Sequence, residues 1–219
     1  MAEINAIIPV KLTNERLPGK NLMQLGDRPL MHYIIETLHR VKEIDQIYVC
    51  CSSDAILDYL PSYAQLVIRP ANLDSNDSNF TDIFSYISGV VSSDIYVYAH
   101  ATAPFVSAST IQRCLQAIMH DGHDSAYTAT VVQDFLWTEC GNPLGFDPQN
   151  IPRSQDLPKF YRETSGIYAF ESNVFMKYKR RVGPNAKAIV VSDTEAIDIN
   201  TIHDFEEAQR VVLERERID

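Results

Sequence analysis

Apolar positions along the chain follow two different periods, and stretches of the two periods alternate. A short apolar run occupies residues 5–10, and residues 30–41 carry apolar side chains three or four positions apart. A second short run follows at 47–51. Spacing of three or four positions gathers side chains on one face of a helix, whereas a short apolar run is typical of a buried strand. The pattern therefore predicts a strand, an amphipathic helix and a strand in succession.

The same alternation continues to the end of the chain. Further strands are predicted at 66–68, 95–99, 126–132, 166–170, 188–191 and 197–199, and further helices at 82–91, 109–119 and from 201 onward. Two residue pairs have the spacing of a helix capping box, Ser109 with Gln112 and Thr201 with Asp204. Strands that alternate with helices predict an α/β fold of three layers around a mostly parallel sheet with right-handed crossovers.

One segment breaks this regularity. Residues 133–159 contain four prolines, two glycines and the only tryptophan of the chain. Loops of this length without secondary structure are uncommon in compact domains. We expect a single domain over 1–219 with an inserted segment at approximately 133–185. This segment would be a substrate lid, an arm that reaches a partner subunit, or a long surface loop.

Composition narrows the class of protein. The 219 residues are 45% hydrophobic, which is enough for one sizeable core. The net charge of -10 argues against a nucleic-acid surface but permits small phosphates, which need only a local cluster of cations. No apolar run approaches the roughly 20 residues of a membrane span, and the first residues enter a strand without a secretory signal. We therefore expect a cytoplasmic protein with no membrane partner.

The cysteines do not have the spacing of a metal site. Cys50 and Cys51 are adjacent in a predicted strand, so their side chains point to opposite faces of the sheet. Cys114 and Cys140 stand alone, and no CxxC pair occurs. Buried, reduced thiols are the expected state of the adjacent pair.

Three polar segments follow predicted strands, at 11–21, 100–104 and 198–201. In an open parallel sheet, ligands bind beyond the carboxyl ends of the strands, where such segments meet. These segments are thus expected to form one binding site.

The first polar segment is rich in cations. Lys11, Arg16 and Lys20 occur within ten residues, and a positive loop at a strand end suits a triphosphate. The alternative is a solvated surface turn. The segment contains Gly19 alone and has neither the spacing of a P-loop nor that of a dinucleotide-binding loop. Charged side chains, rather than a glycine-rich backbone, would have to hold the phosphates.

Five motifs follow one another in the chain. They are IPVKLTNERLPGKN at 8–21, IRPANL at 68–73, HATAPF at 100–105, PRSQDLPKFYRETSGIY at 152–168 and EAIDINTIHDF at 195–205. In this order they resemble the acylneuraminate cytidylyltransferase family, whose members are similar to CMP-sialic acid synthetase, over nearly the whole chain. The resemblance implies a Rossmann-like nucleotidyltransferase fold, CTP as donor, an acidic sugar as acceptor and Mg²⁺ as cofactor. It also implies a homodimer in which the inserted segment contributes to the neighbouring site.

The resemblance assigns a set of residues to the nucleotide. Lys20 would contact the triphosphate with Arg16 beside it, and both would be catalytic. Lys11 stands where an arginine is usual, and lysine lacks the planar fork of arginine for bidentate phosphate contact. The residues so assigned to the nucleotide are Lys11, Arg16, Lys20, Asn21, Arg69 and Ser78.

A second set is assigned to the sugar. His100 occupies a position usually held by glutamine next to the sugar. The alternative is a structural histidine at a strand end whose hydrogen bonds are made within the protein. Arg153 and Arg162 match arginines that approach the sugar or the phosphates, and a guanidinium pairs well with a sugar carboxylate. Thr102 stands where relatives acting on 3-deoxy-octulosonate usually have an aspartate, which weakens the case for the eight-carbon sugar.

The metal site of the family has the pattern Asp-x-Asp, and this chain has Asp198 and Asn200. Two residues apart on a strand, both side chains would face one ion. Asn200 keeps an oxygen ligand but removes one negative charge, so Mg²⁺ should bind less tightly. Asp198 would be catalytic through this ion.

The expected reaction is attack of the anomeric hydroxyl of a nonulosonic acid on the α-phosphate of CTP, with release of pyrophosphate. The general base is open between a metal-bound water and His100. Two alternatives stay open as well. One is a nucleotidyltransferase for 3-deoxy-octulosonate or another sugar, because fold does not determine substrate. The other is a catalytically weakened homologue that binds the nucleotide.

Overall fold

The computed structural model describes residues 2–217 and contains one central seven-stranded sheet. Its strands are β1 (Ile4–Pro9), β4 (Gln46–Cys51), β5 (Ala64–Ile68), β6 (Ile95–Ala99), β7 (Ser125–Val132), β10 (Phe160–Glu171) and β11 (Ala186–Val190). Their order across the sheet is β11-β7-β10-β6-β1-β4-β5. The helices are α1 (Leu30–His39), α2 (Phe80–Val90), α3 (Ala108–Met119), α4 (Ser172–Tyr178) and α5 (Ile202–Glu216).

Shorter elements occupy the connections. Two small ribbons pair β2 (Gln24–Leu25) with β3 (Arg28–Pro29) and β8 (Leu136–Trp137) with β9 (Pro143–Leu144). Four 3-10 turns are η1 (Lys20–Leu22), η2 (Asp54–Tyr59), η3 (Ala71–Asp74) and η4 (Ser154–Asp156).

The sheet is mostly parallel, which confirms the predicted fold class. β1 runs parallel to β4 and β6, β4 to β5, and β7 to β11. β10 is the exception, because it lies antiparallel between β6 and β7. The carboxyl ends of β1, β4 and β6 therefore meet at one edge of the sheet, where ligands bind in open α/β folds.

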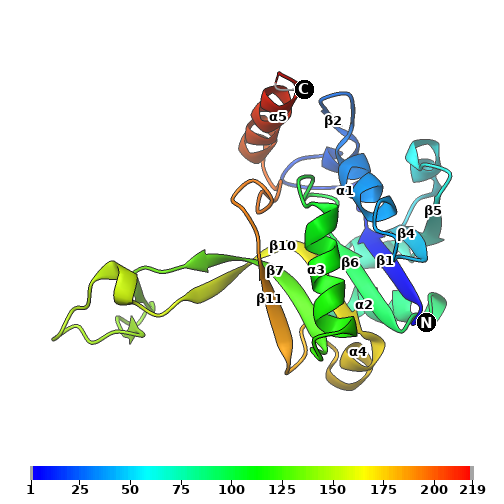
Figure 1. Ribbon diagram of the computed structural model, residues 1–219. Helices are drawn as coiled ribbons and strands as arrows, with labels where there is room; N and C mark the ends of the chain where they lie inside the picture. Colours follow the sequence, from blue (N-terminus) through cyan, green and yellow to red (C-terminus); the bar gives the residue numbers. More distant parts are fainter. Residues whose placement is uncertain (1, 218–219) are drawn as a thin grey trace.

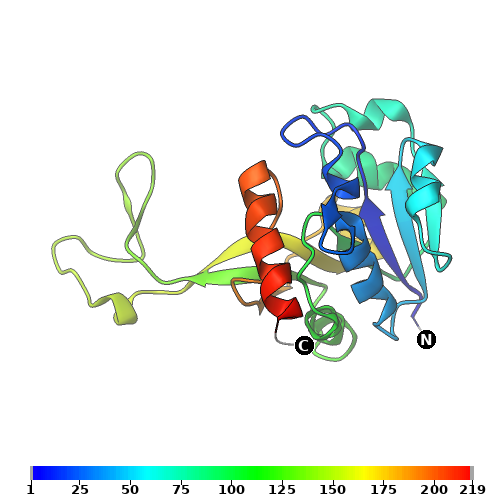
Figure 2. The ribbon, with the colours of Figure 1, turned by 90° about the horizontal axis from the view of Figure 1, so that it is seen from above.

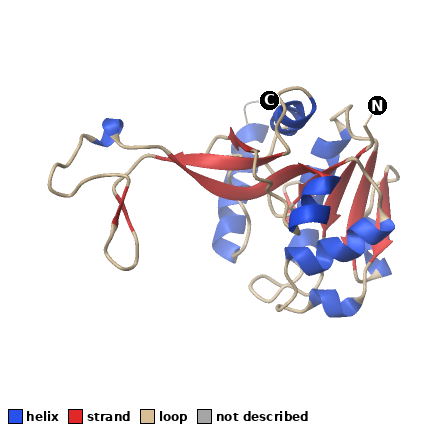
Figure 3. Ribbon diagram, turned by 90° about the horizontal axis from the view of Figure 1, so that it is seen from below, coloured by secondary structure: helices blue, strands red, loops and turns tan. Residues whose placement is uncertain are grey.

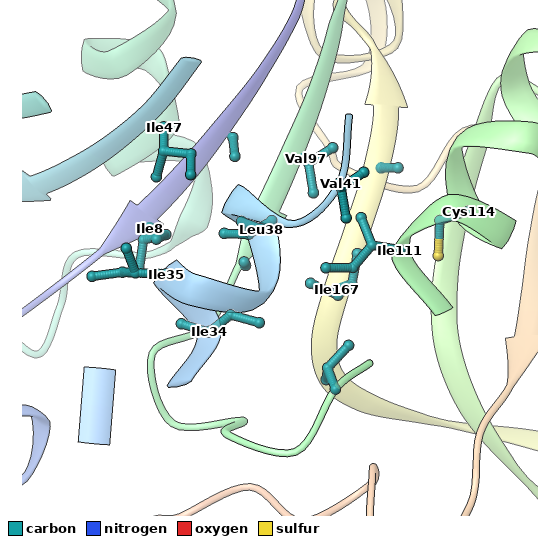
Figure 4. Close-up of a cluster of buried hydrophobic side chains, with 14 of the residues drawn as sticks. Ile8, Ile34, Ile35, Leu38, Val41, Ile47, Val97, Ile111, Cys114 and Ile167 are labelled. Carbon is teal, nitrogen blue, oxygen red and sulfur yellow. The ribbon is translucent and has the colours of Figure 1, made fainter. Parts of the chain in front are cut away.

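Helices cover both faces of the sheet (Figure 1). On one face, Ile34, Ile35 and Leu38 of α1 pack toward Ile8 and Val97 of the sheet (Figure 4). The opposite face carries a separate cluster rich in aromatic rings, contributed by the sheet and by α2 and α4. The members of this cluster with rings are Phe84, Tyr96, Tyr98, Tyr168, Phe170 and Phe175.

Cys50 and Cys51 are both buried, and they belong to the clusters on opposite faces of the sheet. This is the arrangement that their adjacent positions in a strand predict. Both thiols are free, as are those of Cys114 and Cys140.

A long arm leaves the body where β7 and β10 extend beyond the sheet (Figures 2 and 3). Residues 133–159 form its outer part, with β8, β9 and η4 as short elements. Phe135 and Trp137 pack edge to face against Phe146, yet Trp137 is 52% exposed. After the arm, β10 returns to the centre of the sheet and α4 packs on it. Whether the arm acts as a lid or reaches a partner stays a prediction.

Two local predictions were wrong. Ser107 rather than Ser109 caps α3, because Ser107 has extended backbone angles and accepts from the Thr110 amide, whereas Ser109 lies inside the first turn. Residues 197–199 are not a strand: they lie outside the sheet, and the Ile199 amide instead donates to the carbonyl of Thr102 at 2.8 Å. The capping box of Thr201 with Asp204 is present at the start of α5. None of the helices in residues 2–217 has the length and apolar character needed to span a bilayer.

Candidate active site at the carboxyl edge of the sheet

A cavity of about 320 Å³ opens beyond the ends of β1 and β6. Residues from all three predicted polar segments line it, so the expected convergence occurs. The predicted site residues on its wall are Lys11, Arg16, Lys20, Asn21, His100, Thr102, Asp198 and Asn200.

A small apolar cluster beneath the cavity holds the three segments together. It contains Leu17 from the first segment, Phe105 from the turn that follows the second, and Ile199 from the third. Phe205 of α5 completes the packing. Burial of one apolar side chain from each segment keeps the neighbouring polar side chains in a common site.

Lys20 is the buried cation of the cavity. Gly19 adopts a left-handed conformation with φ of 67°, which turns the chain into η1 and carries Lys20 inward until it is 7% exposed. Its Nζ donates to the carbonyl oxygen of Ile199 at 2.7 Å. Burial lowers the pKa of Lys20, and the nearby carboxylate of Asp198 opposes this shift. An ammonium group has three donors, so Lys20 can hold this carbonyl and a phosphate oxygen together.

A chain of hydrogen bonds links the remaining polar residues. Arg16 Nη2 donates to Asn200 Oδ1 at 2.7 Å, and Asn200 Nδ2 donates to Asp198 Oδ2 at 2.8 Å. Thr102 Oγ1 donates to Asp198 Oδ1. Asp198 and Asn200 therefore face the same side, as predicted, although the segment that carries them is not a strand. Asn200 acts here as a bridge that positions Arg16 against Asp198.

These residues fit a single magnesium ion with few protein ligands. Magnesium is often bound through one or two carboxylates together with substrate phosphates and water. Asp198 supplies one carboxylate with lone pairs left on both oxygens, whereas the carbonyl oxygen of Asn200 is engaged by Arg16. Residues 2–217 contain no group of three or more His, Cys, Asp or Glu side chains that could hold a metal ion. Asp198 is therefore the side chain that suits the ion, and the oxygens of a nucleotide would complete the coordination.

A second cavity of about 370 Å³ adjoins the first and shares Pro9, Lys11 and His100 with it. Arg69 lines this cavity but is only 3% exposed. It donates to the carbonyls of Val10 and Cys50 at 3.0 and 2.8 Å and to Asp74 at 2.6 Å. Four of its five N–H donors are thus occupied, which makes Arg69 a tie between strand ends and the wall of the cavity.

Ser78 lies on the same wall and donates from Oγ to the carbonyl of Asn72 at 3.2 Å. Lys11 reaches across to Asn76 with an Nζ to Oδ1 distance of 3.2 Å. The loop of residues 70–79 therefore forms one side of this cavity.

His100 lies between the two cavities. Its Nε2 is buried and has no hydrogen-bond partner within the described part of the chain. The rings of Tyr98 and Tyr168 flank it at centroid distances of 5.4 and 6.2 Å. Burial lowers the pKa of His100 to about 4, and the charge of Arg181 adds to this effect. His100 is therefore a neutral hydrogen-bonding group at neutral pH.

Two predicted residues lie away from both cavities. Arg153 is on the arm, with 74% of its side chain exposed, and pairs with Asp156 at 2.8 Å. Arg162 is exposed on β10, opposite Thr130 of β7. A contact of either arginine with a ligand held in these cavities stays a prediction that involves a partner chain.

Arg181 and Ser165 also line the cavities, although neither was predicted from the sequence. Arg181 follows α4 and lines the second cavity, but next to Arg180 it looks like part of a solvated charge run. Ser165 lines the first cavity with φ of 58°, where the pairing of β10 with β7 shifts between Glu163 and Tyr168. A serine in this conformation is uncommon and often marks a functional site. Its position in the motif ETSG is the sequence feature from which Ser165 could have been predicted as a site residue.

A parallel α/β sheet with a cationic cavity beyond its strand ends is typical of enzymes that bind and transfer nucleotides. The chain belongs to the cytidylyltransferase family, whose sequence model matches residues 5–218. It is thus a nucleotidyltransferase, as the motifs predict. The prediction of the acylneuraminate branch is confirmed at this broader level, and the branch itself stays a prediction.

Individual relatives are distant in sequence. A pseudaminic acid cytidylyltransferase from Campylobacter jejuni is 23% identical over 93% of both chains. A 3-deoxy-manno-octulosonate cytidylyltransferase from Acaryochloris marina is 24% identical over 94% of this chain and 96% of that protein. The solved structure of CMP:2-keto-3-deoxy-manno-octonic acid synthetase complexed with CTP superposes with a TM-score of 0.75 and 16% identity, over 98% of this chain and all of that one. The last similarity concerns the fold.

Proposed function

We propose that this protein transfers CMP from CTP to the anomeric hydroxyl of an acidic sugar of the nonulosonic type and releases pyrophosphate. The supporting observation is the cavity at the carboxyl edge of the sheet, where Lys11, Arg16 and Lys20 surround the space beside a single carboxylate, Asp198. Three cations and one carboxylate suit a triphosphate that shares an ion with the protein.

The chemical step is an in-line displacement. The oxygen of the anomeric hydroxyl forms a bond to the α-phosphorus, the bond from that phosphorus to its bridging oxygen breaks, and pyrophosphate leaves with the bonding electrons. Such a step needs alignment and charge neutralisation rather than covalent chemistry by the protein.

Lys20 and Arg16 supply this neutralisation, since both are held by hydrogen bonds before any ligand binds. Magnesium, when bound, screens phosphate charge, and Asp198 is the side chain that would hold it. His100 stands between the two cavities, so it contacts the acceptor near the attacking hydroxyl. Its buried Nε2 is a candidate to receive the hydroxyl proton or to orient that hydroxyl.

The acceptor has two candidates. Pseudaminic acid is suggested by the relative of that name from Campylobacter jejuni, and 3-deoxy-manno-octulosonate by the relative from Acaryochloris marina. Thr102 favours the first, because the resemblance places an aspartate there in enzymes for the eight-carbon sugar. In this chain Thr102 donates a hydrogen bond to Asp198 instead.

The proposal includes a homodimer. The arm carries Trp137 at 52% exposure and Ile151 at 66%, and apolar side chains exposed on an extended segment suit a contact with another chain. Arg153 on the same arm would then reach the site of the neighbouring subunit.

Pyrophosphate release tests the proposal directly. The purified protein is incubated with Mg²⁺, with CTP, UTP, ATP or GTP, and with pseudaminic acid, N-acetylneuraminic acid or 3-deoxy-manno-octulosonate. The expected result is release with CTP and a nine-carbon acid. Release of pyrophosphate with the octulosonate alone would show that the acceptor is the eight-carbon sugar. Release with another nucleotide in place of CTP would contradict the assignment of CTP as donor. Binding of CTP without turnover on any acid would identify a weakened homologue.

A further inference from the structure

Arg181 is a cation without a counter-ion. Its guanidinium carbon lies 3.6 Å from the ring centroid of Tyr168 and 5.3 Å from that of Phe80. The side chain is half-buried, and it makes no hydrogen bond or ion pair with any residue of the described chain, 2–217. A stacked guanidinium loses water from its face and keeps its N–H groups at the edge. Arg181 is thus oriented to receive a ligand at that edge.

The surrounding wall is deficient in negative charge. Among the described residues that line the 370 Å³ cavity none is acidic, whereas Lys11, Arg69 and Arg181 are all basic. Arg69 is occupied by Asp74 and two carbonyls, and Lys11 uses one of its three donors on Asn76. Arg181 is therefore the cation of this wall whose planar fork of N–H donors carries no hydrogen bond to the described residues.

The ligand group that fits Arg181 is a planar carboxylate. Arginine binds a carboxylate through two parallel N–H donors, and the aromatic stack holds the guanidinium plane in one orientation. The triphosphate has its own cations, Arg16 and Lys20, on the wall of the neighbouring cavity, to which Arg181 does not belong. An anion at Arg181 is therefore a different group from the phosphates.

We propose that Arg181 binds the carboxylate of the acceptor sugar. This inference rests on the proposed function and adds a specificity-determining residue to it. In an ulosonic acid the carboxylate is attached to the anomeric carbon. A residue that grips it also orients the attacking hydroxyl, which is the alignment that this reaction requires.

The test compares Arg181→Met with Arg180→Met. The control makes the same charge change one residue away, where Arg180 is exposed and lies over the ring of Tyr178. With the acid that the wild-type protein turns over, R181M should raise KM for the acid at least 20-fold and leave KM for CTP within twofold. R180M should change neither. Arg181→Lys, which keeps the charge without the fork, should fall between them.

A second readout separates recognition from a structural role. The wild-type protein should prefer the free acid over its methyl ester at least 20-fold in kcat/KM, and R181M should reduce this preference to less than threefold. A merely structural role would lower both rates together and keep the preference, which would overturn the proposal. An increase in KM for CTP alone would overturn it too, by placing Arg181 at the nucleotide. Failure of the wild-type protein to release pyrophosphate would instead refute the proposed function.

Discussion

The cavity at the sheet edge and the arm differ in how their polar groups are held. In the cavity, Arg16 is hydrogen-bonded to Asn200, a residue 184 positions away in the chain. On the arm, Arg153 pairs only with Asp156, three positions away, and most of its side chain faces solvent. Arg16 is thus held by a distant segment of the chain, whereas Arg153 is held only by a neighbour in sequence. In the proposed dimer, groups on the arm would act at the site of the neighbouring subunit.

The largest expected effect comes from Lys20 in the cavity. Lys20→Met removes a preorganised positive charge beside the phosphates and should lower kcat by about 100- to 1,000-fold. Pyrophosphate release under saturating CTP measures this loss. Lys42→Met, at an exposed lysine, is the control and should stay within twofold. If K20M keeps more than a tenth of the rate, the cavity is not where the triphosphate reacts.

A substitution at Arg69 tests whether this side chain stabilises the fold by linking the strand ends to the cavity wall. Arg69→Met leaves Asp74 and two strand-end carbonyls without their buried donor and should reduce the free energy of unfolding by about 3 kcal/mol. Arg40→Met removes the same charge from a side chain that is 70% exposed and should cost less than about 1 kcal/mol. Urea unfolding at neutral pH compares the two. Equal losses of unfolding free energy in the two variants would mean that the buried hydrogen bonds of Arg69 do not stabilise the fold.

The arm is expected to matter for association and not for the body. Trp137→Ser removes an exposed aromatic side chain, and the dissociation constant of the proposed dimer should rise roughly 30-fold, the equivalent of about 2 kcal/mol. Sedimentation equilibrium measures this change. Glu139→Gln, also exposed on the arm, should leave association unchanged. A wild-type protein that is monomeric at high concentration would contradict the proposed role of the arm in association.

His100 makes the stability of the folded protein depend on pH. Its folded-state pKa of about 4 lies below the ordinary value of 6.5, so between these two values the unfolded chain binds a proton that the folded chain does not. Stability should therefore fall as pH decreases, by about 2 kcal/mol between pH 7 and pH 5 from this residue. Urea unfolding of His100→Gln at both pH values should show that much less loss. An unchanged loss would indicate that His100 is solvated.

The smallest effect is expected at Asn200. Asn200→Asp adds a carboxylate beside Asp198, but it removes the amide that now donates to Asp198 and it gains a charge pair with Arg16. Mn²⁺ affinity without nucleotide, measured by electron paramagnetic resonance, should rise only a few-fold. Weaker binding would exclude this pair from the ion site. Turnover that rises sharply would indicate a weakened homologue, whereas unchanged turnover would indicate an enzyme adapted to Asn200.

Several features of the site could be predicted from the sequence because they depend on local order. The period of apolar residues predicts the alternating elements, and the position of 11–21 after β1 predicts a cationic loop at the carboxyl edge. Asp198 and Asn200 are two positions apart and face the same side, where they share a hydrogen bond, as their spacing predicts. The opposite burial of Cys50 and Cys51 has the same cause.

Other features depend on which distant segments become neighbours. The antiparallel position of β10 brings Tyr168 beside His100, and the turn after α4 brings Arg181 over Tyr168. Burial between these segments, with the charge of Arg181 as a second cause, lowers the pKa of His100, and no property of its neighbours in sequence would suggest that. Arg69 shows the same limit, since its donors are occupied by strand ends that lie up to 59 positions away.

The sequence by itself determined the elements, the cationic loop and the family, because periodicity and motif order are written along the chain. The tertiary structure alone decided which charges are paired and which are left for a ligand. The physical reason is that pairing and desolvation depend on distances of a few ångströms between segments, and those distances exist only once the layers have packed.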